Sequence, residues 1–247
     1  MTSLPKKTDK KLGLVIDLDS CVGCHACAVS CKEWNTGGFT GPLEDRDAYG
    51  RDPSGVWYNR VHSYELRNDE GLERTVYFPK SCLHCEDAPC VTVCPTGASL
   101  KRSEDGIVLV NPDHCIGCKL CSWACPYGAR EYDVSAGVMK KCTLGVDRIY
   151  DEDLDEERRV PACVSACPVG ARHFGDLGDP TSDVSILALA REGRALFDEQ
   201  GCKPVNRYLP PRTQVRELDE SNALKPKVKD MSDALKRWAR LDFSGGV

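Results

Sequence analysis

The stretch CIGCKLCSWACP, residues 115–126, contains four cysteines separated by two, two and three residues, and a proline follows the last of them. Three thiolates this close together can wrap one iron-sulfur cluster, while the fourth reaches a neighbouring cluster. The proline removes a backbone N–H group and turns the chain out of the loop. A cluster-binding fold is therefore expected if such groups recur along the chain.

Four groups of this kind occur, and they contain 15 of the 16 cysteines. In the fourth group Gly145 occupies the place of the second cysteine, and Cys202 stands outside every group. Three groups end in Cys-Pro, as bacterial ferredoxin runs do. The groups are Cys21, Cys24, Cys27 and Cys31; Cys82, Cys85, Cys90 and Cys94; Cys115, Cys118, Cys121 and Cys125; and Cys142, Cys163 and Cys167.

Zinc binding and disulfide formation are two other uses of clustered cysteines. Zinc proteins use C-x2-C pairs separated by ten or more residues, which three thiolates within seven residues do not suit. Disulfides are rare in the reducing compartment where a chain without an export signal is expected. His25, His84 and His114 adjoin cysteines and are expected to be solvent-facing neighbours of the clusters rather than ligands.

Composition narrows the function classes. The chain has 247 residues with 16 Cys but only 5 Phe and 4 Trp, so something other than hydrocarbon is expected to fill part of the interior. A net charge of -5 argues against a general nucleic-acid binder. No Ser/His/Asp set, phosphate loop or acid pair appears, so no catalytic residues are assigned and the chain is not expected to be an enzyme on its own.

Targeting signals are also missing from the expected places. The basic start MTSLPKKTDKK leads into LGLVIDLD and not into a long apolar region with a cleavage site. The longest apolar run, VSILALA at residues 184–190, is far below the roughly 18 residues of a membrane span. We therefore expect a chain on the cytoplasmic side, although co-export with a signal-bearing partner would place it in the periplasm.

Internal repeats predict the architecture. LGLVIDLDSCVGCHAC parallels DGIVLVNPDHCIGCKLC, and CPTGAS, CPYGAR and CPVGAR follow the second, third and fourth groups. A strand, a ligand loop, a short helix and a return strand make half of a ferredoxin, so four halves predict an α+β fold with two ferredoxin-like modules. The expected outer module is 12–31 plus 132–175, and the inner module is 82–131.

The intervening segments predict hairpins. Residues 57–66 and 74–79 are strand-like runs within an insertion spanning 32–81. EYDVSAGVMKK, residues 131–141, predicts a second hairpin with its bend at Ser135, Ala136 and Gly137.

Residues 176–247 are expected to form a helical extension and a partner-docking tail. A first helix is predicted after a cap at Thr181, Ser182 or Asp183, ending at Gly201. A second, amphipathic helix is predicted over 228–243, which packs on its own domain or docks to a partner. The positions expected to be apolar contacts are Ile186, Leu189, Ala190 and Leu196 in the first helix, and Val228, Met231, Leu235 and Trp238 in the second.

From residue 12 to about 212 the chain resembles the four-cluster iron-sulfur subunits of membrane-bound molybdopterin oxidoreductases, the dimethyl sulfoxide reductase and polysulfide reductase type. The four groups in this order, the four-residue gap within the second group and the long gap within the fourth carry the resemblance. VIDLDSCVGCHACAVSCKEWNTG, NRVHSYE and KPVNRYLPPR most resemble the iron-sulfur subunits of cytoplasmic membrane-bound sulfite dehydrogenases.

The resemblance implies how the groups share ligands. Spacing supports an exchange of the last cysteine within a pair of groups, and the resemblance pairs the outer two groups and the middle two. The implied sets are Cys21, Cys24, Cys27 and Cys167 for cluster one; Cys82, Cys85, Cys90 and Cys125 for cluster two; Cys115, Cys118, Cys121 and Cys94 for cluster three; and Cys142, Cys163 and Cys31 for cluster four.

The resemblance also implies the function. It indicates a subunit that relays single electrons between a molybdopterin-containing catalytic subunit and a quinone-binding integral membrane anchor, in sulfite oxidation or in a dimethyl sulfoxide, polysulfide or tetrathionate reductase. A peripheral position on the cytoplasmic face of the inner membrane follows. A free polyferredoxin and a zinc scaffold are the alternatives from other classes.

Gly145 decides the expected cofactor content. Glycine supplies no thiolate, so three [4Fe-4S] clusters and one [3Fe-4S] cluster of high potential are predicted. The alternatives are four [4Fe-4S] clusters, with the last iron held by water, Asp147 or Cys202, or an empty or structural fourth site. Cys202 is otherwise expected to be a buried apolar thiol.

Overall fold

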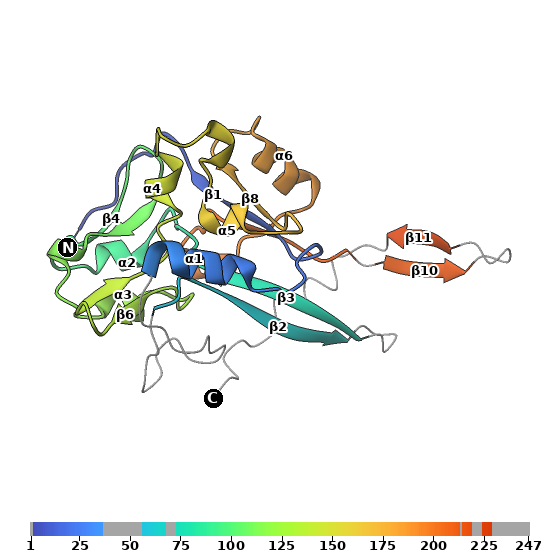
Figure 1. Cartoon of the computed structure of the whole chain (residues 1–247), viewed down its shortest axis with the longest axis horizontal. Coiled ribbons are helices and arrows are strands. Elements are labelled where there is room, and N and C mark those ends of the chain that lie inside the picture. The colour runs from blue at the N-terminus through green and yellow to red at the C-terminus, as the bar shows by residue number, and fades with distance from the viewer. Residues whose placement is uncertain (1, 37–55, 68–72, 213, 219–223, 229–247) are drawn as a thin grey trace.

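The computed structural model describes residues 2–36, 56–67, 73–212, 214–218 and 224–228. At its centre, strand β1 (Leu12–Asp17) lies between β8 (Arg172–Asp176), which is antiparallel to it, and β9 (Arg207–Leu209), which is parallel. Residues 13–17 of β1 are all buried, as expected for an apolar run that is covered on both faces. This sheet brings the N-terminal strand against segments from late in the chain (Figure 1).

The first and fourth cysteine groups meet beside this sheet. Helix α1 (Ala26–Thr36) follows the first group and packs against α5 (Ala162–Ser165) of the fourth. Helix α4 (Val146–Ile149) and the 3-10 turn η2 (Glu156–Arg158) lie between Cys142 and Cys163. The two groups are therefore neighbours in space although the whole middle of the chain separates them.

The middle groups are held by short local elements. Helices α2 (Pro89–Thr92) and α3 (Leu120–Trp123) pack together. Strands β4 (Ser99–Lys101) and β5 (Val108–Val110) form an antiparallel hairpin, followed by the 3-10 turn η1 (Pro112–His114). The hairpin expected in residues 131–141 is confirmed as β6 (Glu131–Asp133) and β7 (Val138–Lys140). The result is the expected mixture of small helices and strands.

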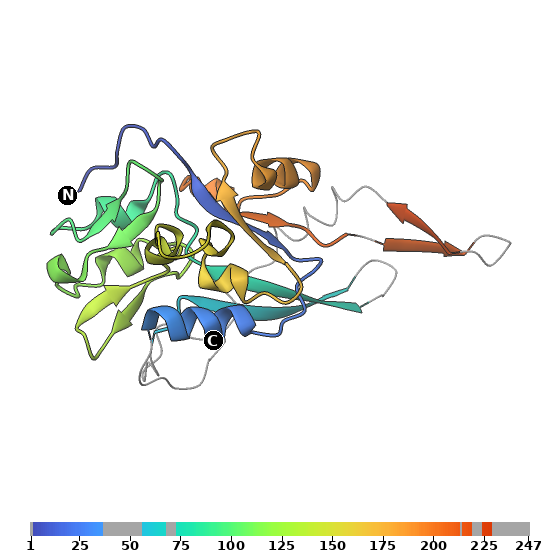
Figure 2. The same ribbon diagram turned by 45° about the horizontal axis from the view of Figure 1, so that its top comes forward.

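A longer antiparallel pair, β2 (Asn59–Arg67) and β3 (Glu73–Ser81), forms at the two strand-like runs predicted for the insertion. Val61, Val76 and Phe78 from this pair are buried in the main core. Much of the predicted insertion, residues 37–55, lies outside the described residues. A further antiparallel pair, β10 (Gln214–Leu218) and β11 (Leu224–Val228), extends from the rest of the chain (Figures 1 and 2).

The helix expected to end at Gly201 is shorter than predicted. Helix α6 (Asp183–Ala190) begins at the Ser182 cap, whose Oγ accepts from Ser185 N at 3.3 Å. It ends where Glu192 adopts a left-handed backbone and Gly193 N donates to the Ala188 carbonyl at 2.6 Å. The chain then forms a β-bridge between Arg194 and Tyr208, followed by the 3-10 turn η3 (Asp198–Gln200).

The apolar face predicted for this helix was also wrong. Ile186 and Leu189 are 54% and 84% exposed, and Ala190 is exposed. Val184 instead packs on Val15 and Leu209 of the central sheet, while Leu196 is buried as expected. The second predicted helix, residues 228–243, lies outside the described residues except for Val228, which ends β11.

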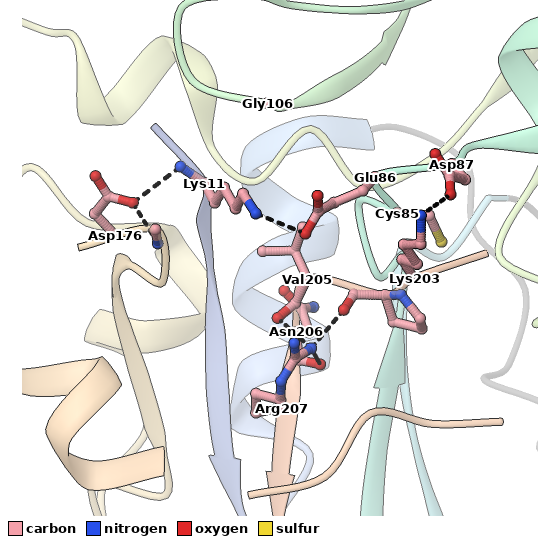
Figure 3. A network of polar contacts seen from close by, with 12 residues as sticks. Lys11, Cys85, Glu86, Asp87, Gly106, Asp176, Lys203, Val205, Asn206 and Arg207 are labelled. Atoms are coloured by element: carbon pink, nitrogen blue, oxygen red, sulfur yellow. Dashed lines mark hydrogen bonds and ion pairs between the residues drawn. The ribbon is translucent and has the colours of Figure 1, made fainter. Parts of the chain in front are cut away.

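The segment after η3 ties the central sheet to the second cysteine group (Figure 3). Asn206 is fully buried; its Oδ1 accepts from Leu14 N at 2.9 Å and its Nδ2 donates to the Cys82 carbonyl at 3.1 Å. Lys11 Nζ and Lys203 Nζ pair with Glu86 at 2.9 Å and with Asp87 at 2.6 Å. Strand β1 and the loop that follows Cys82 are therefore held by one polar network.

Within the described residues, none of the helices has the length and apolar composition that a membrane crossing requires.

Candidate metal-cluster sites

All 16 cysteines are described, and none forms a disulfide. Over the described ranges, no three Cys, His, Asp or Glu side chains lie close enough to bind a single metal ion. The cysteines of the predicted first, second and fourth sets lie within reach of one another's charges, and those of the third line one cavity.

The second set brings together Cys82, Cys85, Cys90 and Cys125. Burial raises the pKa of Cys85, and the charges of the other three thiols raise it further. Burial also raises the pKa of Cys125 to about 11, with Cys82 and Cys90 adding to the effect. These mutual effects show that the last cysteine of the third group lies with the first three of the second, as the exchange of ligands requires.

The third set lines one cavity. The thiols of Cys94, Cys115, Cys118 and Cys121 surround it, together with apolar side chains that include Met139. Ser99 N donates to Cys94 Sγ at 3.3 Å, and Met139 N donates to Cys115 Sγ at 3.3 Å. Backbone N–H groups aimed at sulfur favour the thiolate form that a cluster needs.

The first set combines cysteines that lie far apart in the sequence, Cys21, Cys24 and Cys27 with Cys167. The pKa of Cys21 is raised by burial, and the charges of Cys27 and Cys167 contribute. Ala171 N donates to Cys167 Sγ at 3.2 Å, and Asn59 Nδ2 donates to Cys27 Sγ at 3.2 Å. Cys24 belongs to the same loop and is the exposed member of the set.

The fourth set consists of Cys31, Cys142 and Cys163, all buried. Burial raises the pKa of Cys31, with the charges of Cys142 and Cys163 adding to it. Burial likewise raises the pKa of Cys142 to about 12, although Lys141 opposes the shift. Leu144 N donates to Cys142 Sγ at 3.3 Å.

Gly145 is conformationally different from the cysteine it replaces. In the third group the left-handed residues Gly117 and Lys119 flank Cys118, whereas in the fourth group Leu144 and Gly145 are themselves left-handed, at φ of 57° and 65°. Helix α4 starts directly after Gly145. A Cβ at this position would lie 3.0 Å from Pro161 Cα, so the backbone leaves little room for any side chain there.

The two side chains considered as substitutes for that ligand lie elsewhere. Asp147 is exposed, and its Oδ2 accepts from Trp34 Nε1 at 2.7 Å. Cys202 is buried as expected, and its carbonyl accepts from Asp87 N at 3.1 Å. The pKa of Cys85 is raised mainly by burial and by the other three thiols of the second set, and the Cys202 thiol raises it further. Cys202 therefore lies beside the second set.

The expectation that all three histidines face solvent was wrong for His84. His84 is fully buried, and its Nδ1 accepts from Val108 N at 3.2 Å. Burial lowers its pKa well below the ordinary value, and nearby cations, Lys141 first among them, lower it further, so the ring is neutral. His114 is exposed and His25 is half-buried.

Three buried cations beside the thiols were missed in the sequence. Arg130 Nη2 lies 3.0 Å from Cys90 Sγ, Lys141 Nζ lies 3.4 Å from Cys82 Sγ, and Arg172 Nη1 lies 3.6 Å from Cys163 Sγ. Arg130 and Arg172 are the last residues of the repeated motifs CPYGAR and CPVGAR. This repetition could have predicted that both arginines lie beside a cluster. The donors, the thiol sets and their spacing together fit iron-sulfur clusters.

Comparison with known proteins agrees with this chemistry. Two family models described as 4Fe-4S dicluster domains match residues 20–98 and 73–177. Each model spans groups that are consecutive in sequence, whereas in the structure the first group meets the fourth.

Three relatives illustrate the similarity. The sulfite dehydrogenase subunit designated B in Allochromatium vinosum is 58% identical over 85% of this chain and 87% of its own length. The corresponding tetrathionate reductase subunit of Salmonella typhimurium is 36% identical over 81% and 72%. The corresponding anaerobic dimethyl sulfoxide reductase subunit of Escherichia coli is 38% identical over 68% and 74%. The chain therefore belongs to the family of iron-sulfur electron-transfer subunits that includes these three proteins, as its cysteine groups indicate.

Proposed function

We propose that this chain relays single electrons between a molybdopterin-containing catalytic subunit and a quinone-reactive membrane anchor, in a complex that oxidises sulfite. The four cysteine sets would hold the clusters assigned to them above, and iron-sulfur clusters exchange one electron at a time. The 58% identity to a sulfite dehydrogenase subunit supports sulfite over the dimethyl sulfoxide or tetrathionate chemistry of the more distant relatives.

The observation that carries this proposal is the spatial order of the sets. Arg172 lies between the thiols of the first and fourth sets, and Arg130 lies between those of the second and third. Lys141 Nζ donates to the thiol of Cys82 in the second set and to the carbonyl of Cys142 in the fourth. The sets thus form a series in the order first, fourth, second, third. A series with two ends suits a relay between two partners better than it suits a free shuttle.

Exposure supports the choice of ends. The exposed cysteines are Cys24 in the first set and Cys118 in the third. Exposed apolar residues adjoin the ligands of both sets in sequence: Val22 and Val169 at the first set, and Ile116 and Trp123 at the third. Exposed apolar side chains next to a cluster ligand suit a contact with a partner subunit. We assign the first to the catalytic subunit and the third to the membrane anchor, which places the chain peripherally at the membrane, on the cytoplasmic face unless it is co-exported.

The fourth set supports a three-iron site. Three thiols converge there, and the position of the missing ligand has no side chain. Asp147 accepts from Trp34, and the thiol of Cys202 lies beside the second set. We therefore propose three [4Fe-4S] clusters and one [3Fe-4S] cluster.

An iron and sulfide count with EPR spectroscopy tests the cofactor assignment. Anaerobically purified protein should contain about 15 irons per chain and show a three-iron signal when oxidised. A colourless protein with stoichiometric zinc would overturn the proposal in favour of a scaffold. About 16 irons without an oxidised-state signal would overturn the three-iron assignment alone.

Reconstitution with the two partners tests the relay. Sulfite added to the complete complex should reduce the clusters and then a quinone. Trp123→Glu should release the chain from the anchor while sulfite still reduces its clusters, and Val169→Glu should do the reverse. Full activity as a soluble shuttle, with no association in detergent, would contradict the proposal.

A further inference from the structure

Three cationic side chains, Arg130, Lys141 and Arg172, are only 1%, 3% and 3% exposed. A buried charge is costly unless opposite charge compensates it. For Arg130 and Arg172 the charges that face the guanidinium most strongly belong to cysteine sulfurs. Their burial is therefore explained if those sulfurs are the thiolates of anionic clusters.

Arg130 bridges the second and third sets. Its Nη2 donates to Cys90 Sγ at 3.0 Å and to Ser99 Oγ at 2.8 Å. Ser99 N in turn donates to Cys94 Sγ at 3.3 Å, and Cys121 of the third set also faces the guanidinium. A continuous hydrogen-bonded path thus runs from one set to the next through a positive charge.

Arg172 bridges the fourth and first sets in the same way. Its Nη1 donates to Cys163 Sγ at 3.6 Å, a long contact, and its Nη2 donates to Asn59 Oδ1 at 2.6 Å. Asn59 Nδ2 then donates to Cys27 Sγ at 3.2 Å. Asn59 therefore has the bridging role here that Ser99 has beside Arg130.

Lys141 lies at the remaining junction, between the fourth and second sets. Its Nζ donates to Cys82 Sγ at 3.4 Å and to the Cys142 carbonyl at 2.6 Å. Lys141 is only 3% exposed, so its ammonium is held between these two sets with little access to water. Each of the three junctions in the series therefore contains one buried cation.

We propose that Arg130, Lys141 and Arg172 set the redox potentials of the relay, each stabilising the reduced form of the two sites that it separates. This inference rests on the proposed function. In each transfer the donor site loses one electron and the acceptor site gains it, so the negative charge moves from one side of a fixed cation to the other. At Arg130 and Arg172 no proton has to move, because a guanidinium stays charged throughout.

EPR-monitored redox titration of the neutral variants Arg130→Gln, Lys141→Met and Arg172→Gln tests the proposal in the intact complex. Each variant should lower the potentials of the two bridged sites, shifting their oxidised-to-reduced ratio at fixed potential at least tenfold, which is about 59 mV. Arg130→Gln should leave the first site unchanged, and Arg172→Gln should leave the third unchanged, so each variant is the control for the other.

Arg130→Lys separates charge from contact. It keeps the positive charge, so the second and third sites should stay within tenfold of the wild-type ratio. Equal shifts in Arg130→Lys and Arg130→Gln, shifts spread evenly over all sites, or no shift would overturn the proposal. Loss of clusters in all three neutral variants would also overturn it, in favour of a purely structural role. An absence of iron and sulfide in the wild-type protein would instead contradict the proposed function itself.

Discussion

The middle and outer pairs of cysteine sets differ in how far apart their parts lie in the chain. The second and third groups are consecutive and have one β4–β5 hairpin between them, whereas the first and fourth groups enclose the whole middle pair. The local pair keeps eight cysteines, and its bridging residues Ser99 and Arg130 come from the same repeated motif. The distant pair has seven, and it takes its bridging amide, Asn59, from strand β2.

The two pairs share some features of the repeat and differ in others. Both pairs have a cation beside the thiols, Arg130 in the middle pair and Arg172 in the outer pair. The outer pair lacks a counterpart of Ser99, and it has Gly145 in place of one cysteine. Closing the outer pair requires ordering a long intervening chain, which costs entropy. The central sheet and the contact of α1 with α5 offset this cost by holding the two ends of the outer pair together.

The largest expected contrast between the pairs comes from deleting one cysteine in each. Cys142→Ala leaves two thiols in the fourth set, too few for any cluster, so about three irons should be lost and the relay should be interrupted. Cys118→Ala leaves three thiols in the third set, so at most about one iron should be lost and a second three-iron signal should appear. Iron and sulfide analysis with EPR measures both results. A three-iron signal that survives in Cys142→Ala would show that the fourth set is wrongly assigned.

Asn206 joins the two pairs, because its side chain links β1 to the Cys82 loop. Asn206→Ala leaves the buried Leu14 N–H and the Cys82 carbonyl without these partners, which should cost about 1–3 kcal/mol. Thermal unfolding of the cluster-loaded chain should shift down by roughly 2–4 °C for each kcal/mol. Lys203→Ala, which removes only an exposed pair with Asp87 from the same segment, should change stability by about 0–1 kcal/mol. Equal shifts in both variants would show that Asn206 is not a joint between the pairs.

The features that could be predicted from the sequence are the local ones. Cysteine spacing and alternating strands gave the ligand groups and the β2–β3 and β6–β7 hairpins, because turn chemistry and ligand geometry act over a few residues. The early end of α6 could not be predicted, since the chain leaves the helix to form the bridge of Arg194 with Tyr208. The burial of His84 and Lys141 likewise depends on packing between segments that no local pattern specifies.

The smallest expected effect concerns Gly145, where the outer pair departs most from the repeat. Sequence comparison within the chain suggests that Gly145→Cys should restore the eighth cysteine and convert the fourth site to four irons. The structure indicates otherwise, because the left-handed backbone would cost a non-glycine residue about 1–2 kcal/mol and the new Cβ would lie 3.0 Å from Pro161 Cα.

We therefore expect Gly145→Cys to keep the oxidised three-iron signal and to gain no iron, with a small loss of stability that Gly145→Ala should match. Both variants differ from wild type only by a side chain in the same confined place, so an alanine variant that is less stable by the same amount would identify the backbone as the cause. Gain of a fourth iron in Gly145→Cys would show that the loop before α4 can shift away from Pro161. In that case the outer pair would differ from the middle pair only by the missing thiol, and not by the conformation of its loop.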